Sequence, residues 1–163
     1  MTKAIEWTLL TLIFSTLIPF TAIYYSWRRG WISSFHLDKR EERWKFFVIS
    51  IISALTGAIV LYELNAPRVL TVAMVNYVIL GLVMMTITFF WKISLHASSI
   101  TAFMVAVVVV FGTQYWWALL FTLPVLWARY YLKKHTAMQL IAGTFVSCVI
   151  TFFTFSYFLK SVK

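Results

Sequence analysis

A short polar segment, WKISLHASS, covers residues 91–99 and lies between two long apolar runs. It contains Lys92, Ser94 and His96 within five positions. A lysine ammonium and a serine hydroxyl can bind phosphoryl oxygens, and a histidine can donate or accept a proton during reaction. These residue types therefore fit the binding and cleavage of a phosphate ester.

A second polar segment, ARYYLKKHTAMQLIAG, covers residues 128–143 and carries Arg129, His135 and Gln139. Histidine and glutamine four positions apart share one face of a helix. The same face continues with small and polar residues, which are Gly143, Ser147 and Thr151. Close helix packing of the small-xxx-small kind accounts for that continuation. It does not account for Arg129 and His135, which are candidates for phosphate chemistry.

The composition identifies the environment of these segments. Of 163 residues, 62% are hydrophobic and 12% are charged, and the mean hydropathy is +0.87. Soluble domains carry about a quarter charged residues. The chain is therefore an integral membrane protein, and its apolar runs leave room for one membrane domain, residues 1–163. A single cysteine, Cys148, excludes a disulfide framework.

The apolar runs predict an all-α membrane protein, a bundle of six transmembrane helices of roughly 20 residues each. The predicted spans are 5–27, 46–64, 69–90, 93–112, 115–132 and 136–158. The first run is long and has no clear cleavage site, so we interpret it as a span and not as a signal peptide. Tryptophans near the span ends support the count. We expect Pro124 to kink the fifth span.

The basic residues divide unequally between the two sides of this bundle. Four lie on one side, and ten lie on the other, in the junctions after the first, third and fifth spans. The ten are Arg28, Arg29, Lys39, Arg40, Arg43, Lys45, Lys92, Arg129, Lys133 and Lys134. The positive-inside rule predicts that this side is cytoplasmic and that both termini lie outside. A binding site for an anionic headgroup would gather the same residues in either orientation.

In order, the polar segments resemble the motifs of the type 2 phosphatidic acid phosphatase superfamily of membrane lipid phosphatases. Its P-S-G-H motif corresponds to Ile93–His96, which keeps the serine and the histidine. Its S-R-x5-H-x3-D motif corresponds to Ala128 followed by Arg129, His135 and Gln139. The resemblance extends from about Phe35 to the end of the sixth span.

The first motif of that superfamily, K-x6-R-P, is the least clear. The segment DKREERWK offers Arg43 for the arginine, with Trp44 in place of the proline and His36 in place of the lysine. Lys39 or Arg40 are alternatives for the lysine. A mixed charge run beside a span is also typical of a solvated juxtamembrane helix attracted to anionic lipid.

The resemblance implies a metal-independent phosphatase without a cofactor. His135 would attack phosphorus to form a phosphohistidine, and His96 would protonate the leaving oxygen of the lipid alcohol. The phosphoryl group would be bound by basic and hydroxyl side chains, which are Arg129, Arg43, Lys92, Ser94, Arg40 and Lys39. The scarcity of carboxylates beside the two histidines also argues against a magnesium site.

One departure concerns Gln139, which stands where the family has an aspartate that holds the nucleophilic histidine. Its amide oxygen can still fix the ring tautomer but brings no negative charge. In a serine-protease triad the analogous change lowers turnover about ten-thousand-fold. Asp38, Glu41 or Glu42 lies on the same side and is a candidate for the missing charge. The second motif also lacks the proline and glycine of the family.

The expected function is hydrolysis of a lipid phosphate in phospholipid metabolism, at the plasma (inner) membrane and on its cytoplasmic face. Phosphatidic acid, phosphatidylglycerol phosphate and polyprenyl phosphates all remain candidate substrates. The main alternative is an inactive relative that binds lipid phosphate headgroups or serves in a larger membrane assembly, with a homo-oligomer also open. A small transporter is a third alternative. Nucleic-acid binding is not expected, because the net charge of +9 is divided among loops.

Overall fold

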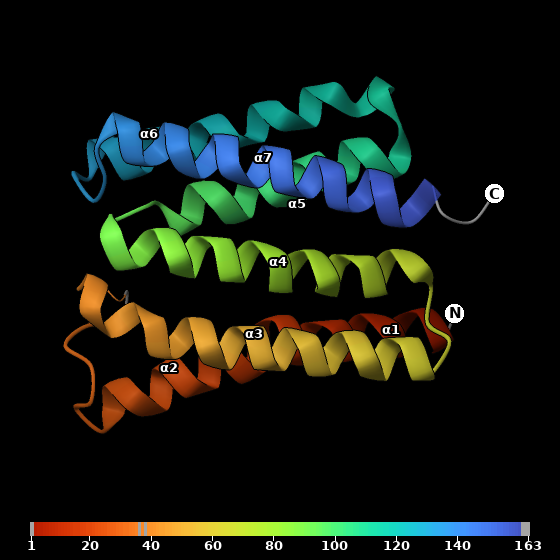
Figure 1. Cartoon of the computed structure of the whole chain (residues 1–163), viewed down its shortest axis with the longest axis horizontal. Helices are drawn as coiled ribbons and strands as arrows, with labels where there is room; N and C mark the ends of the chain where they lie inside the picture. The colour runs from red at the N-terminus through yellow and green to blue at the C-terminus, as the bar shows by residue number, and fades with distance from the viewer. Residues whose placement is uncertain (1, 36, 38, 161–163) are drawn as a thin grey trace. The chain divides into compact units, whose positions relative to one another are not determined.

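A computed structural model describes residues 2–35, 37 and 39–160, and every regular element in these ranges is helical (Figure 1). The all-α prediction is confirmed. Contacts divide the chain into two compact units, the first ending at Phe90 and the second beginning at Trp91. Whether the whole chain acts as one membrane domain stays a prediction.

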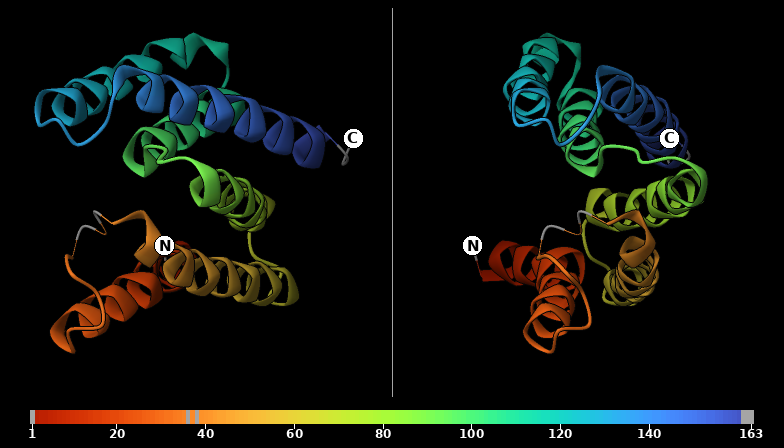
Figure 2. Two further views of the ribbon diagram at one scale, coloured as in Figure 1. Left: turned by 60° about the vertical axis from the view of Figure 1, so that its left-hand side comes forward. Right: turned by 90° about the vertical axis from the view of Figure 1, so that its left-hand side faces the viewer.

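The first unit contains three helical rods. Its elements are α1 (Thr2–Leu12), the π-helical turn η1 (Ile13–Leu17), α2 (Ile18–Arg28), α3 (Arg40–Glu63) and α4 (Arg68–Phe90). α1, η1 and α2 form one continuous rod that packs along α3, and α3 lies side by side with α4 (Figures 1 and 2). Small residues of α3, Ala54 and Ala58, are buried with Leu61 and with Met74 of α4, which lets the helices approach closely.

Pro19 explains the π-helical turn in the first rod. Proline has no backbone N–H, so a carbonyl one turn earlier loses its donor. In η1 the N–H of Ile18 bonds to the oxygen of Ile13, five residues back, and in the same register Pro19 leaves Phe14 without a donor. The hydroxyl of Ser53 on α3 donates to the Phe14 oxygen at 2.6 Å. A neighbouring helix thus supplies the bond that proline removes, as membrane helices require.

The second unit begins at Trp91 and contains the two segments singled out in the sequence. Its elements are α5 (Leu95–Phe111), the 3₁₀ segment η2 (Thr113–Phe121), α6 (Thr122–Tyr131) and α7 (Ala137–Lys160). α5 packs along α7, while η2 and α6 run back along α5 in the opposite direction (Figures 1 and 2). Consequently the beginnings of α5 and α7 and the end of α6 lie at one end of this unit.

Within the residues that the structure describes, four helices are long and apolar enough to cross a membrane: Lys3–Arg28, Arg40–Glu63, Arg68–Phe90 and Ala137–Leu159. By length and composition the chain is a multi-pass membrane protein. α5 is apolar but has 17 residues, about 25 Å at the helical rise. The run at 115–132 is divided between η2 and α6. The fourth and fifth predicted spans therefore remain predictions.

The helix of the second predicted span extends beyond that span. α3 starts at Arg40, ahead of the predicted span start at residue 46, so the REERWK segment is the beginning of the helix. Glu41 and Glu42 lie in its first turn, where negative charge interacts favourably with the helix dipole. This matches the interpretation of the charge run as a juxtamembrane helix.

The irregular part of the fifth span lies before Pro124 and not at it. η2 is wound as a 3₁₀ helix, and Tyr115 inside it has non-helical torsion angles. Pro124 removes the bond that would tie an α-helix to the carbonyl of Leu120, and its ring crowds the same carbonyl. Tighter winding of the preceding turn avoids that conflict.

Three helices end in the same type of backbone turn. In the Schellman motif the residue after the C-cap is left-handed, and the N–H of the next residue donates to the carbonyl five residues back. Gly30, Asn65 and Lys133 have positive φ values of 71°, 54° and 52°. The corresponding bonds close α2, α3 and α6: Trp31 N to Ser26 O, Ala66 N to Leu61 O and Lys134 N to Arg129 O.

Candidate functional site

The two polar segments meet at one end of the second unit. The backbone N–H of Ser94, just before α5, donates to the carbonyl oxygen of Gln139 in the first turn of α7 at 3.4 Å, a long hydrogen bond. This hydrogen bond joins the segment that contains His96 to the segment that contains His135.

The start of α7 is fixed by a capping box. The N–H of Gln139 donates to Oγ1 of Thr136 at 3.4 Å, and the N–H of Thr136 donates to Oε1 of Gln139 at 3.2 Å. The box satisfies two N–H groups that the helix cannot pair by itself. Gln139 therefore has a structural role in addition to the one expected of it.

Gln139 also holds the ring of His135. Its Oε1 atom lies 3.1 Å from Nδ1 of His135. Because the Thr136 N–H already donates to the same atom, that atom is the amide oxygen, and Nδ1 must be the donor. In a neutral His135 ring the proton is then on Nδ1, and Nε2 carries the lone pair. A nucleophilic histidine needs this tautomer.

Arg129 lies in the last turn of α6 and is half-buried. Its carbonyl oxygen accepts the Lys134 N–H at 3.1 Å, and the N–H of Lys133 donates to the carbonyl oxygen of Tyr130 at 2.9 Å. The left-handed Lys133 turns the chain sharply here. As a result only a tight turn separates the end of α6 from His135 and the start of α7.

The three residues of the first segment have different environments. Ser94 is fully buried, and its hydroxyl accepts the Ala97 N–H at 3.4 Å as the N-cap of α5. His96 is exposed in the first turn of α5, and Lys92 is half-buried just before it. The Ser94 hydroxyl is thus engaged in starting the helix, while His96 and Lys92 face more open surroundings.

This end of the second unit is strongly cationic. Residues 91–163 contain no aspartate and no glutamate. Four basic residues belong to the junctions gathered here: Lys92, Arg129, Lys133 and Lys134. Uncompensated positive charge favours an anionic ligand. It also means that no carboxylate of this unit can supply the charge that Gln139 lacks.

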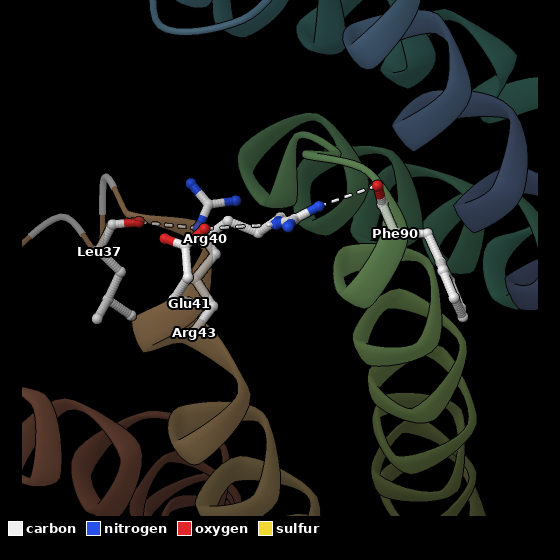
Figure 3. Close-up of polar contacts among 5 residues, drawn as sticks. All are labelled: Leu37, Arg40, Glu41, Arg43 and Phe90. Carbon is white, nitrogen blue, oxygen red and sulfur yellow. Dashed lines mark hydrogen bonds and ion pairs between the residues drawn. The ribbon is translucent and has the colours of Figure 1, made fainter.

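The basic residues expected for the first motif belong to the first unit, where two of them make contacts within that unit (Figure 3). Arg43 is buried, and its Nε donates to the carbonyl oxygen of Leu37 at 2.8 Å. Arg40 donates from Nη1 to the carbonyl oxygen of Phe90 at 2.9 Å, the position where a cation best stabilises the end of α4. Lys39 is exposed at the N-cap of α3.

The acidic candidates for the missing charge are also in the first unit. The Glu42 carboxylate accepts hydrogen bonds from the N–H and the hydroxyl of Ser33 at 3.1–3.2 Å. Glu41 lies 3.8 Å from Nε of Arg40. Both carboxylates therefore make local contacts. Asp38 and His36 lie outside the described residues.

Within residues 2–35, 37 and 39–160, no group of three or more His, Cys, Asp or Glu side chains is placed to hold a metal ion. The residues gathered around His135 offer nitrogen donors and hydroxyls but no carboxylate. Such a set suits an anion far better than a hard cation.

Two features of the molecule were missed from sequence. The capping box has a plain signal, Thr136 followed three positions later by Gln139, directly before an apolar run. The π-helical turn has a weaker one, Pro19 inside the first run. Ser53, whose hydroxyl bonds to the Phe14 carbonyl in this turn, lies 34 positions from Pro19, and no local sequence pattern connects these two residues.

Comparison with protein-family models, with curated proteins and with solved structures finds no match for this chain.

Proposed function

We propose that this protein is a membrane phosphatase that hydrolyses a lipid phosphate through a phosphohistidine on His135. The observation that carries the proposal is the shared oxygen of Gln139, which assigns the proton to Nδ1 of His135. Nε2 is then the nucleophile. The motif resemblance and the hydrogen bond that orients the imidazole ring both support His135 as this nucleophile.

The surroundings of His135 support an anionic substrate. The charge of Lys92, Arg129, Lys133 and Lys134 is not offset by any acidic residue in the second unit. Arg129 would bind two phosphoryl oxygens with its planar guanidinium, and Lys92 would add a point charge. The buried Ser94 would act by fixing the start of α5, which carries His96.

In the first step Nε2 of His135 forms a bond to phosphorus as the bond from phosphorus to the lipid oxygen breaks. His96, in its protonated form, donates a proton to that leaving oxygen, and the lipid alcohol departs. His96 then accepts a proton from water as the water oxygen attacks phosphorus. The nitrogen–phosphorus bond breaks, orthophosphate leaves and His135 returns to its starting form.

The contribution of the first unit is a separate part of the proposal. Arg43, Arg40 and Lys39 belong to that unit, and their part in binding the phosphoryl group stays a prediction. Arg40 and Arg43 each donate one N–H to a backbone carbonyl oxygen, and a guanidinium carries five N–H donors. We further propose that the phosphate site lies on the cytoplasmic face of the plasma membrane, because the excess of basic residues is on the same side as this site.

The decisive experiment measures phosphate release by the purified protein in detergent with a chelator present. The substrates are phosphatidic acid, phosphatidylglycerol phosphate and a polyprenyl phosphate. We expect release from at least one, loss of release in His135→Ala, and an acid-labile phosphoprotein in wild type that is absent from His135→Ala. In His96→Ala the phosphoprotein should form slowly. Release unchanged in His135→Ala would overturn the proposal.

A second candidate function, binding of lipid phosphate without turnover, is favoured by the neutral Gln139. The amide keeps the ring oriented but does not stabilise the imidazolium that forms during reaction. In that case no substrate would release phosphate. Retention of lipid phosphates would then depend on Arg129 and Lys92 and be unaffected by His135→Ala.

A further inference from the structure

A small pocket opens at the end of the first unit where α3 begins and α4 ends. Its volume is about 110 Å³, several times the roughly 30 Å³ that one water occupies in the liquid. Six residues line it: Arg40, Glu41, Trp44, Met85, Thr88 and Phe89. It has room for a small polar group but not for an acyl chain.

Thr88 is an unusual member of this lining. It is 3% exposed, yet its Oγ1 atom makes no hydrogen bond to the described part of the chain. Threonines in helices usually donate to the carbonyl four residues earlier, and Thr86 on the same helix does so with Leu82 at 2.9 Å. A buried hydroxyl without a partner is costly. A ligand group that enters the pocket beside Thr88 would supply the acceptor that this hydroxyl lacks.

Two opposite charges border the same pocket. Arg40 and Glu41 lie 3.8 Å apart through Nε and Oε1, and Arg40 bonds to Phe90 through Nη1 (Figure 3). Neither contact uses Nη2, which carries two further N–H donors. The Glu41 carboxylate is largely exposed. A ligand that has an anionic group beside a cationic group matches this pair better than a simple anion does.

The position of the pocket indicates where such a ligand comes from. It lies at the ends of two helices long and apolar enough to cross the membrane, which is the depth of lipid headgroups. Trp44 and Phe89 in its lining are 45% and 54% exposed. An amphipathic indole prefers this depth, and both rings can contact the first carbons of acyl chains.

We propose that this pocket binds the headgroup of a phospholipid that carries both a phosphodiester and a primary ammonium group. Nη2 of Arg40 and the Thr88 hydroxyl donate to the phosphate oxygens, and the ammonium donates to the Glu41 carboxylate. A quaternary ammonium has no N–H to donate to the Glu41 carboxylate. An anionic headgroup without an amine leaves the negative charge of Glu41 facing the negative charge of the phosphate. The inference does not rest on the proposed phosphatase, because it needs neither His135 nor His96 and all six lining residues belong to α3 and α4.

The test offers the full-length protein an equimolar mixture of phosphatidylethanolamine, phosphatidylcholine and phosphatidylglycerol with identical acyl chains. Native mass spectrometry then measures which lipid is retained. We expect enrichment of phosphatidylethanolamine, weakened about tenfold in Thr88→Val, the effect of one hydrogen bond to a charged group. Glu41→Gln should remove the preference over phosphatidylcholine.

Two matched variants control for general effects. Thr86→Val removes a hydroxyl from the same helix outside the pocket lining, and Glu63→Gln removes a charge at the other end of α3. Both should retain lipid as wild type does. Thr88→Val should also unfold at the same or a higher temperature in lipid-free detergent, because it removes an unpaired buried hydroxyl.

Equal retention of the three lipids, enrichment of phosphatidylglycerol or retention of none would each overturn the proposal. So would losses in Thr86→Val and Glu63→Gln that equal those in Thr88→Val and Glu41→Gln. Because Glu41 is exposed, Glu41→Gln is expected to fold, and the ammonium contact stays testable even where Thr88→Val is poorly folded.

Discussion

Gly143 of α7 packs directly against the backbone of Ser94 at the start of α5. A Cβ atom added to Gly143 would lie 2.8 Å from the Ser94 carbonyl oxygen, with Ala97 and Ile93 also within 4 Å. Only glycine allows this approach, which brings the segment around His96 to the segment around His135. The small-residue stripe noted in α7 is therefore a packing surface at this position.

Substituting Gly143→Ala should destabilise the protein by about 1–3 kcal/mol, the usual cost of overpacking a tight contact. Denaturant titration in detergent measures the change. Gly81→Ala is the matched control, because its Cβ would lie 2.9 Å from Cγ1 of Ile51, a side-chain atom and not backbone. An equal effect of the two substitutions would show that the approach of α7 to Ser94 is not a special constraint.

Gln139→Glu should increase phosphate release at least tenfold if the proposed mechanism holds. Glutamate serves the capping box as well as glutamine does, and its carboxylate stabilises the imidazolium that forms on His135, as the aspartate of a serine-protease triad does. Gln139→Leu should abolish release. Initial rates with the preferred lipid phosphate provide the measurement.

Thr136→Ala separates the two roles of Gln139. It removes one hydrogen bond of the cap, which costs about 1 kcal/mol, but leaves the contact between Gln139 and His135 in place. Release by Thr136→Ala should stay near the wild-type rate. If phosphate release by Thr136→Ala instead fell as far as release by Gln139→Leu, loss of the helix cap would account for both losses. Orientation of the His135 ring would then not be what limits the reaction.

Ser53→Ala should cost about 1 kcal/mol or more, because it removes the donor to the Phe14 carbonyl. Pro19→Ala returns a backbone N–H to the first rod. In that background Ser53→Ala should be nearly neutral, and a double-mutant cycle of unfolding free energies measures the coupling. Additive effects of the two substitutions would contradict the explanation of the π-helical turn.

Lys133→Gly should stabilise the protein by about 1 kcal/mol, since a left-handed conformation strains any residue that has a Cβ. Thermal unfolding in detergent is the measurement. Lys134→Gly removes the same charge from the next position, where the backbone has no positive φ, and should give no increase. Equal shifts in the two variants would indicate a charge effect and not relief of strain.

The sequence by itself determined that the chain is helical and membrane-embedded, because a polar backbone cannot cross lipid unless it pairs within its own helix. It also predicted that the junctions beside Ser94 and Gln139 lie on one side of the bundle, since successive spans run in alternating directions. Hydropathy does not detect that α3 begins at Arg40, ahead of the predicted span, because the first turn of the helix is charged and hydropathy detects apolar length and not helix length.

Only the tertiary structure decided how individual polar groups are used. Gln139 has the same sequence signal whether it caps a helix, orients a histidine or does both, and only the positions of Thr136 and His135 distinguish these uses. Likewise the Thr86 hydroxyl bonds to its own helix, whereas the Thr88 hydroxyl is buried without a partner among the described residues, in a residue that lines a pocket. Such differences depend on which groups lie within hydrogen-bonding distance, a property of the packed chain that residue type and spacing do not specify.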